Sequence, residues 1–309
     1  MSTNLHPDLQ KKVPSLTFSR WNIKLFRFAM KYLSPKHEPR DSIETSIVVL
    51  DGIELRVHKP KAKDFTSALL WIHGGGLIIG DPNQDDGRCA EFAERLQITV
   101  IAVKYRLAPE HPSPAAIDDC FAAWSAIQEH HEELGINPQS VVIGGASAGG
   151  GLAASLALRV RDEGAQHPRG QLLVYPMLDD RTTQDIQINP KGHLVWNNQS
   201  NATGWGAYLG DALGQDTIPP YAAAARHDNL DNLPQTWIGV GTLDLFHDED
   251  LAYAERLITN DISTTVHIVE GGYHGFDALD EQAQVSKDFV SAMVDFLHHC
   301  FHETIPTQD

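Results

Sequence analysis

Residues 144–151 read GGASAGGG and join an apolar run at 141–144 to a run of small and apolar residues at 148–161. The first run is typical of a buried strand and the second of a helix. Gly-x-Ser-x-Gly between a strand and a helix is the pattern of a nucleophile elbow, a strained turn that exposes the serine hydroxyl. Glycines beside the serine remove Cβ atoms that would clash in such a turn. The pattern predicts that Ser147 is a nucleophile.

A glycine-rich phosphate loop is the alternative interpretation of the same stretch. A P-loop ends in Gly-Lys-Ser or Gly-Lys-Thr, and a dinucleotide-binding loop has G-x-G-x-x-G after its strand. Residues 144–151 fit neither pattern. The nucleophile elbow is therefore the better interpretation.

Outward from the elbow, apolar strands alternate with helices in both directions. Strands are expected at 68–72, 99–105, 141–144, 172–175, 236–241 and 265–269, and helices at 88–96, 115–130, 148–161 and 249–258. The turn Asp51-Gly52 between two apolar runs predicts a β-hairpin ahead of them. Continuously apolar strands separated by helices indicate a parallel sheet covered on both faces. The expected fold class is α/β, a mostly parallel, doubly wound sheet.

Two segments do not follow this alternation. The first 42 residues contain apolar side chains at helical spacing, which predict an amphipathic helix. Residues 179–225 are richer in Asn, Gln, Gly and Trp and show no clear period. We therefore divide the chain into an N-terminal arm at 1–42, a core at 43–178, an insertion at 179–225 and a second part of the core at 226–309.

The chain is acidic, with 24 Lys and Arg against 41 Asp and Glu in 309 residues, a formal charge of −17. This balance argues against nucleic acid and against anionic lipid surfaces as partners. Three cysteines without C-x-x-C spacing suit a reducing compartment. The start of the chain lacks a signal-peptide pattern, and no run of about 18 apolar residues predicts a membrane span. We expect a cytoplasmic protein without membrane insertion.

Backbone donors are expected just after the strand at 68–72, where the chain reads His73-Gly74-Gly75-Gly76. Adjacent glycines leave their N–H groups accessible to a ligand. In α/β-hydrolases the loop at this position supplies donors to an oxyanion. The alternative is a flexible turn without a ligand.

A serine hydroxyl needs a base, and histidine is the usual one. Of 16 histidines, His274 lies in the loop that leaves the last strand, which is the position expected for the order Ser, then acid, then His. The acid should follow a strand between the two, and Asp244 directly follows 236–241. Its competitors are Asp248, Glu249 and Asp250, although these are better placed to begin the next helix and interact with its dipole.

A metal site receives little support from the sequence. His298 and His302 are four residues apart and could share a ligand, but no further ligands lie near them in the chain. We expect no metal and no organic cofactor.

With these motifs in hand, the chain resembles the hormone-sensitive lipase-like family of α/β-hydrolase esterases. The resemblance rests on HGGG at 73–76, YRLAPE at 105–110, the serine elbow, DLFHDE at 244–249 and HGF at 274–276. It covers nearly all of the chain from about residue 65 onward. It implies an α/β-hydrolase fold of about eight strands with a helical cap formed by the N-terminal arm and the insertion.

The resemblance also implies roles for individual residues. Ser147, Asp244 and His274 would form a catalytic triad, and the N–H groups of Gly75, Gly76 and Ala148 would form the oxyanion hole. Supporting positions around them would be His73, Gly74, Tyr105, Arg106, Glu110 and Asp248. The chain departs from the family at Ala146, where an acidic residue is more common, and at Leu245, where proline is usual. Neither departure removes a reacting group.

The implied activity is a carboxylesterase that hydrolyses a small-molecule ester through an acyl-enzyme. The charge and the polar insertion favour soluble esters with short to medium acyl chains. Side chains expected to line the pocket are Leu77, Phe18, Trp21, Phe26, Trp196, Trp205 and Tyr208. The alternative for many of them is packing of the cap on the core. A homodimer is common among similar proteins, but no residue of this chain establishes one.

Two other functions remain open at this point. The same machinery could cleave amide, lactone or arylformamide substrates, since a triad serves all acyl transfers. The family also includes non-catalytic plant hormone receptors, which lose the catalytic histidine, whereas this chain retains His274.

Overall fold

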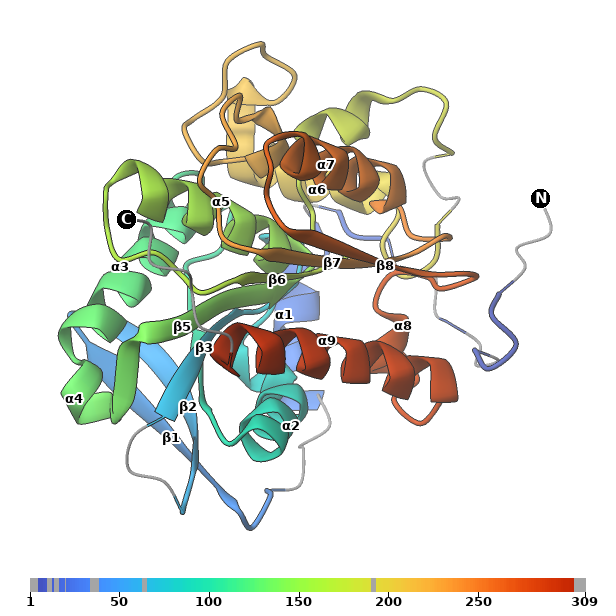
Figure 1. Ribbon diagram of the computed structural model, residues 1–309. Helices are drawn as coiled ribbons and strands as arrows, with labels where there is room; N and C mark the ends of the chain where they lie inside the picture. Colours follow the sequence, from blue (N-terminus) through green and yellow to red (C-terminus); the bar gives the residue numbers. More distant parts are fainter. Residues whose placement is uncertain are drawn as a thin grey trace.

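The computed structural model describes residues 5–9, 13, 17–19, 21–33, 39–62, 66–189 and 193–302. In this part of the chain, eight strands form one sheet in the order β1-β2-β4-β3-β5-β6-β7-β8 (Figure 1). The strands are β1 Ile43–Leu50, β2 Ile53–Pro60, β3 Thr66–Ile72, β4 Thr99–Val103, β5 Ile136–Ala146, β6 Gln171–Val174, β7 Thr236–Gly241 and β8 Thr264–Val269. Only the pairings of β2 with β1 and with β4 are antiparallel. The predicted α/β fold with a mostly parallel sheet is confirmed.

The central strands are buried on both faces, as their composition requires. β4 reads TVIAV and is buried at every position, and β6 reads QLLV and is equally buried. β1 lies at the sheet edge, where Ile47 and Val49 are exposed. The hairpin between β1 and β2 turns at Asp51 and Gly52, which both have positive φ. This is the backbone that a two-residue hairpin loop favours.

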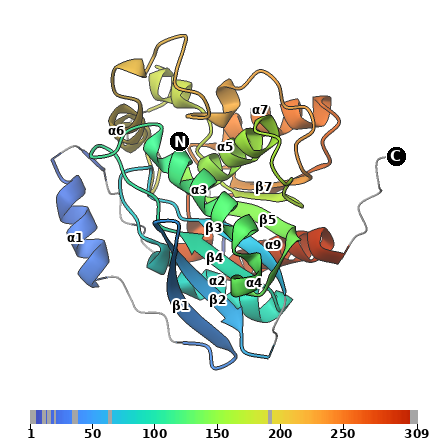
Figure 2. The same cartoon turned by 90° about the vertical axis from the view of Figure 1, so that its left-hand side faces the viewer.

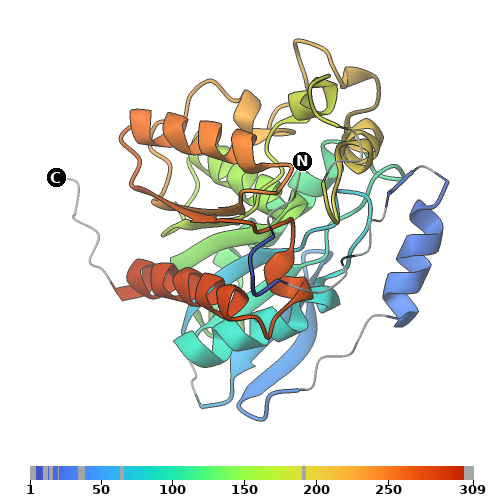
Figure 3. The same cartoon turned by 90° about the vertical axis from the view of Figure 1, so that its right-hand side faces the viewer.

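Helices cover the two faces of the sheet in separate groups (Figures 1 and 3). α2 Asp86–Leu96 and α9 Gln284–His302 pack together on one face. α3 Ala115–Glu129, α5 Ala148–Asp162 and α7 His247–Thr259 cover the other. Side chains of one strand alternate between the two cores: Leu70 and Ile72 of β3 join the second group, and Trp71 joins the first. Two apolar layers therefore hold the sheet from both sides.

Shorter elements complete the described part of the chain. They are α1 Ile23–Leu33, α4 His131–Leu134, α6 Asn198–Leu209 and α8 Phe276–Leu279, with 3-10 turns η1 Pro82–Asp85, η2 Asp180–Gln184, η3 Gly210–Ala212 and η4 Ala224–Arg226. None of the helices among the described residues has the length and hydropathy that a membrane crossing requires.

The N-terminal arm contacts α6, a helix of the insertion. The Phe18 N–H donates to Ser200 Oγ at 3.0 Å, and Thr203 Oγ1 donates to the Phe18 carbonyl at 3.0 Å. Asn197 caps the start of α6 by accepting a hydrogen bond from the Ser200 N–H at 3.0 Å. The division of the chain into arm, core and insertion remains a prediction, and these contacts are what it would require of a joint cap.

The observed boundaries of several strands differ from the sequence prediction, most of all at the start of β5. β5 begins at Ile136 rather than at 141, because Asn137 and Gln139 alternate with less exposed residues and interrupt the apolar run without ending the strand. The strand predicted at 99–105 ends at Val103. Ile136, the first residue of β5, pairs with Thr66 of β3, and the register then shifts so that the next pair is Val141 with Ala68.

We predict that Gly149 of α5 tolerates no side chain. A Cβ there would lie 2.0 Å from the Ile72 carbonyl oxygen at the end of β3, so helix and strand would have to separate. Gly149→Ala should lower the free energy of unfolding by about 1–3 kcal/mol, the usual cost of overpacking. Urea denaturation measures this change.

Gly206→Ala in α6 is the matched control. A Cβ at that position meets only Leu213 Cδ2 at 3.8 Å. Alanine is the better helix former by about 1 kcal/mol, so this variant should be neutral or more stable. Equal destabilisation of both variants would show that backbone contact at Gly149 is not the cause.

Candidate active site

Ser147 occupies a strained turn between β5 and α5. Its backbone has φ 56° and ψ −121°, a conformation that non-glycine residues rarely adopt. The Ser147 N–H donates to the Val174 carbonyl at 2.9 Å, and the Ser147 carbonyl accepts from the Met177 N–H at 2.9 Å. These bonds to the end of β6 and the residues after it hold the turn in place. The serine thus has the backbone that the elbow motif predicts.

His274 reaches this serine from the loop after β8. Its Nε2 lies 2.9 Å from Ser147 Oγ. The imidazole is held between two aromatic rings, with Tyr175 at 4.8 Å and Phe246 at 5.2 Å between ring centroids, both nearly edge-on. These contacts fix the orientation of the ring toward the serine.

Asp244 follows β7 and completes the chain of hydrogen bonds. Its Oδ2 lies 2.8 Å from His274 Nδ1, and its Oδ1 accepts from the Phe246 N–H at 3.0 Å. The Asp244 side chain is fully buried. An ionised carboxylate only accepts hydrogen bonds, so Nδ1 carries the proton and Nε2 is left to accept from the serine hydroxyl. This is the tautomer that a general base requires.

Asp248, the competing acid, lies elsewhere. Its side chain is completely exposed and its carboxylate is 2.8 Å from His247 Nδ1. It begins α7, as a residue that complements the helix dipole would. The structure therefore brings Asp244 to His274 and leaves Asp248 outside, which also contradicts the supporting role predicted for Asp248.

The glycine loop after β3 lies directly against the elbow. A Cβ on Gly74 would be 3.0 Å from the Ala146 carbonyl oxygen and 3.3 Å from Ser147 Cβ. Gly75 and Gly76 have φ of 124° and 58°, positive values that residues with a Cβ rarely adopt. Ala148 is the first residue of α5, so its N–H has no partner within the helix. The predicted donors thus come from two adjoining turns.

His73 and Tyr105 brace this glycine loop. Their rings stack with centroids 4.2 Å apart, and Tyr105 Oη donates to the His73 carbonyl at 2.9 Å. His73 Nδ1 donates to the Gly74 carbonyl at 2.8 Å. Burial lowers the pKa of His73 to about 4, so the ring is neutral and its proton stays on Nδ1. The bracing predicted for these two residues matches their contacts.

Arg106 and Glu110 form ion pairs with residues outside the glycine loop. Arg106 forms an ion pair with Asp119 of α3 at 2.8 Å. Glu110 pairs with Arg27 of α1 at 2.8 Å, and Arg27 also donates to the Ile78 carbonyl at 2.7 Å. The predicted bracing of the glycine loop by these two residues is therefore not direct. They attach α3 and α1 to the core.

The side chains predicted to line the pocket have different surroundings. Trp196 packs on the glycine loop, since a Cβ on Gly76 would lie 2.0 Å from its ring. Phe18 lies between Trp196, at 5.4 Å, and Phe26, at 4.7 Å. Leu77, Trp205 and Tyr208 are buried in the same apolar core. Trp21 is wrongly predicted, because its side chain is 96% exposed and faces solvent.

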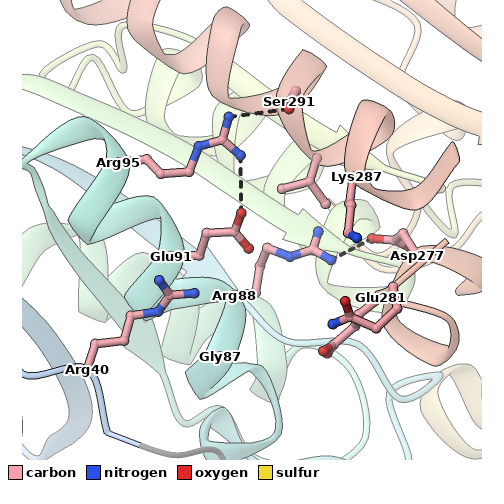
Figure 4. A pocket seen from close by; sticks show the side chains of 11 residues that line it. Arg40, Gly87, Arg88, Glu91, Arg95, Asp277, Glu281, Lys287 and Ser291 are labelled. Atoms are coloured by element: carbon pink, nitrogen blue, oxygen red, sulfur yellow. Dashed lines mark hydrogen bonds and ion pairs between the residues drawn. The ribbon is translucent and has the colours of Figure 1, made fainter. Parts of the chain in front are cut away.

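Sequence reasoning missed a buried polar chain behind the histidine. Tyr175, whose ring contacts His274, donates from Oη to Asp277 Oδ1 at 3.0 Å. Asp277 Oδ2 pairs with Arg88 of α2 at 2.9 Å. Arg88 and Asp277 line a cavity of about 350 Å³ between α2 and α9 (Figure 4). Tyr175 is the last residue of the strand predicted at 172–175 and directly follows the observed β6, so its place at the carboxyl end of a strand was the one signal available.

Glu249, which the sequence placed only at the start of a helix, has contacts that were not predicted. Its Oε1 accepts from the N–H groups of Leu178 and Asp179, at 2.7 and 3.2 Å. Burial raises the pKa of Glu249 to about 8. Burial also raises the pKa of its neighbour Asp250, and the charges of Glu249 and Asp244 add to that effect. Glu249 joins α7 to the first residues of the insertion.

Among the described residues, one group of three side chains could place ligand atoms around a metal ion. Asp51, Glu129 and His130 place ligand atoms within 4.8 Å of one another at the surface. His298 and His302 stack their rings at 4.0 Å, and His302 Nδ1 contacts the His298 carbonyl at 2.8 Å. Neither group includes Ser147, Asp244 or His274.

Known proteins are similar to this chain in sequence and in fold. The family described as alpha/beta hydrolase fold matches residues 69–278. Esterase LipI of Mycobacterium tuberculosis is 33% identical over 67% of this chain, which spans 65% of the length of LipI. Carboxylesterase NlhH of the same species is 32% identical over 78% of this chain and 77% of its own. A solved bacterial heroin esterase superposes with a TM-score of 0.84 at 32% identity, covering 97% of this chain and 98% of that one.

We predict that His73 makes the stability of the fold sensitive to acid. In the unfolded chain its pKa is near the ordinary value of 6.5, whereas in the folded protein it is about 4. Between these values the unfolded state binds one more proton, so falling pH favours unfolding by about 1.4 kcal/mol per pH unit. Chemical denaturation of wild type and His73→Asn across pH 4–6.5 measures the effect.

The advantage of the wild type over His73→Asn should shrink as the pH falls through that window. Other titrating groups are common to both proteins and cancel in the difference. Two parallel stability curves between pH 6.5 and 4 would contradict the assignment.

Proposed function

This chain belongs to the α/β-hydrolase fold family, in its hormone-sensitive lipase-like group of esterases, and on that premise we propose that it is a serine carboxylesterase. In this proposal Ser147 is the nucleophile, His274 the general base and Asp244 the residue that orients the base. The oxyanion donors are the N–H groups of Gly75, Gly76 and Ala148. The relatives named as esterase, carboxylesterase and carboxylic ester hydrolase support the reaction class.

One observation carries the assignment of the residues. A continuous hydrogen-bonded path runs from Ser147 Oγ to His274, at 2.9 Å, and from His274 to the buried Asp244, at 2.8 Å. The three side chains come from three separate loops at the carboxyl ends of β5, β7 and β8. A purely structural role would not require a serine on a strained turn beside a histidine with a free Nε2 lone pair.

Acylation follows from these contacts. His274 Nε2 takes the proton from Ser147 Oγ as the oxygen attacks the ester carbonyl carbon. The carbonyl π electrons move to the oxygen, which accepts hydrogen bonds from the backbone donors. When the tetrahedral intermediate collapses, the C–O bond to the alcohol breaks and the imidazolium of His274 returns the proton to the departing alkoxide. Asp244 stabilises the imidazolium while it exists.

Deacylation repeats the same steps with water. His274 removes a proton from the water that attacks the acyl carbon, and it then protonates Ser147 Oγ as the acid leaves. Preorganised backbone donors stabilise both tetrahedral intermediates, at roughly 2.7–4 kcal/mol for each donor in comparable sites. The reaction as written needs no metal and no organic cofactor.

Small esters with short to medium acyl chains are the proposed substrates. A relative from Pseudomonas putida, 30% identical over 77% of this chain, is named ethyl acetate hydrolase. In the present chain the ring of Trp196 lies against Gly76 and limits the space beside the glycine loop. Amide, lactone and arylformamide substrates are the competing proposal. Retention of Ser147, Asp244 and His274 in contact argues against a non-catalytic receptor.

The proposed compartment is the cytoplasm. Cys89, Cys120 and Cys300 are buried thiols, and burial raises the pKa of Cys89 and Cys120. Thiols of this kind suit a reducing environment.

We predict that Ser147→Ala abolishes the covalent route. The turnover number for a p-nitrophenyl ester should fall by on the order of 10⁵–10⁶, since loss of the nucleophile removes the acyl-enzyme. Steady-state kinetics measure the loss, and circular dichroism verifies that the variant is folded. Retention of a tenth of the activity would end the proposal.

The two candidate acids provide the matched comparison. Asp244→Asn should cost roughly 10⁴ in turnover, because the amide no longer holds the required tautomer. Asp248→Asn should change turnover by less than about twofold, as expected of an exposed surface residue. The reverse order would transfer the role to Asp248.

We further predict that activity declines with acyl length. Activated esters from acetyl to hexanoyl should be hydrolysed with higher kcat/KM than dodecanoyl esters, because Trp196 restricts the site. A series of p-nitrophenyl esters, with a p-nitroanilide and a lactone included, measures this. Faster cleavage of the amide or the lactone would favour the competing substrate classes, and a preference for the longest chain would contradict the size argument.

A further inference from the structure

The exposed side of α1 carries an apolar stripe. Trp21, just before the helix, is 96% exposed, and Leu25 and Phe28 are 69% and 62% exposed. Their spacing of four and three residues places them on one helical face. Figures 2 and 3 show α1 at the outer edge of the molecule, to one side of the sheet. Contiguous exposed apolar side chains of this size usually mark a contact surface.

The opposite side of α1 is attached to the core near the proposed active site. Ile23 is buried, and Phe26 packs on Phe18 at 4.7 Å. Arg27 donates to the carbonyls of Ile78, at 2.7 Å, and Ala108, at 2.6 Å. Ile78 lies two residues after Gly76 in the glycine loop. α1 therefore carries the stripe on one side and contacts the glycine loop on the other. A surface that binds the stripe would lie on the α1 side of that loop.

The charge of this part of the chain is opposite to that of the rest. The N-terminal arm at 1–42 contains eight Lys and Arg against three Asp and Glu, a charge of +5, whereas the remaining residues carry −22. Lys24 is exposed on α1, and α1 has no acidic residue. A helix with basic residues and an exposed Trp, Leu and Phe stripe is typical of helices that lie in the headgroup region of a membrane.

We propose that α1 binds the surface of an anionic lipid bilayer, with Trp21, Leu25 and Phe28 in the headgroup region. The overall charge of −17 argued against such a surface, but the average conceals the division between arm and core. Charges farther than about 8–10 Å from the lipid are largely screened at physiological salt, so a basic residue on α1 itself, such as the exposed Lys24, matters more than the net charge of the chain. Binding of this kind does not require a helix that crosses the membrane.

A second copy of the chain is the less suitable occupant. Three side chains of roughly 150–250 Å² each bury less area than the about 800 Å² per partner of a standard protein interface. Lipid binding needs no such area, because insertion of each apolar side chain and attraction of each basic residue contribute separately. Lipid binding would bring esters dissolved in the bilayer to an enzyme of the proposed class.

Trp21 supplies a spectroscopic reporter for the test. The other five tryptophans are at most 4% exposed, so a change in emission on lipid binding reports on Trp21. The full chain is mixed with vesicles of phosphatidylcholine alone or of phosphatidylcholine with phosphatidylglycerol, and binding is measured by co-sedimentation and by fluorescence. We expect a blue shift and binding to the anionic vesicles that weakens at high salt. Trp21→Phe should still bind but lose the blue shift.

Two triple variants test whether lipid binding depends on the stripe or on exposed apolar side chains anywhere on the surface. Replacement of Trp21, Leu25 and Phe28 by serine should weaken binding by tenfold or more, and Lys24→Gln alone by roughly fivefold. Replacement of Ile47, Val49 and Ile186, which are 57%, 63% and 98% exposed, should leave binding unchanged. All variants should hydrolyse a soluble ester at the wild-type rate, so failure of the lipid proposal is distinct from failure of the esterase proposal.

Three outcomes would overturn the proposal. The first is equal binding of wild type and the stripe variant to anionic vesicles. The second is absence of wild-type binding at low salt. The third is a wild-type dimer that becomes a monomer in the stripe variant without any lipid binding, which would assign the stripe to self-association.

Discussion

The backbone of Ser147 is the constraint on which the rest of the site depends. At φ 56° and ψ −121° it is strained, and it persists because β6 and the residues after it hold it from both sides through Val174 and Met177. The same turn fixes the serine hydroxyl, the first N–H of α5 and the packing of Gly149 on β3. Burial of the sheet between two helical layers therefore supplies the rigidity that a preorganised catalytic site requires.

The surroundings of His274 extend this rigidity away from the serine. Phe246 and Tyr175 contact the imidazole ring, and Phe246 also donates its N–H to Asp244. Tyr175 is in turn connected through Asp277 to Arg88 on the opposite helical layer. The position of the base is therefore set by elements from both faces of the sheet, with α2 contributing through Arg88 and α9 through the stacking of Phe289 on Tyr175 at 6.5 Å between ring centroids.

Much of this arrangement could be predicted from local sequence, and the failures have a common physical origin. The Gly-x-Ser-x-Gly motif selected Ser147. The places of Asp244 and His274 after later strands selected the other two, because parallel strands bring their carboxyl ends to one edge. Position in the sequence also favoured Asp244 over Asp248, and the structure adds the contact between Asp244 and His274. Trp21 was misplaced because apolarity does not report which way a side chain faces. The Tyr175, Asp277 and Arg88 chain joins residues up to 189 positions apart, and no local pattern encodes such a contact.

Covalent labelling of the native enzyme tests the central claim most directly. Paraoxon, an activated phosphate triester, traps a serine that is deprotonated by a neighbouring histidine, and peptide mass spectrometry identifies the labelled residue. The account predicts one stoichiometric adduct on Ser147, complete loss of esterase activity, and no adduct on the His274→Ala variant under the same conditions. An adduct at another residue with parallel loss of activity, or full activity after Ser147 is labelled, would contradict it.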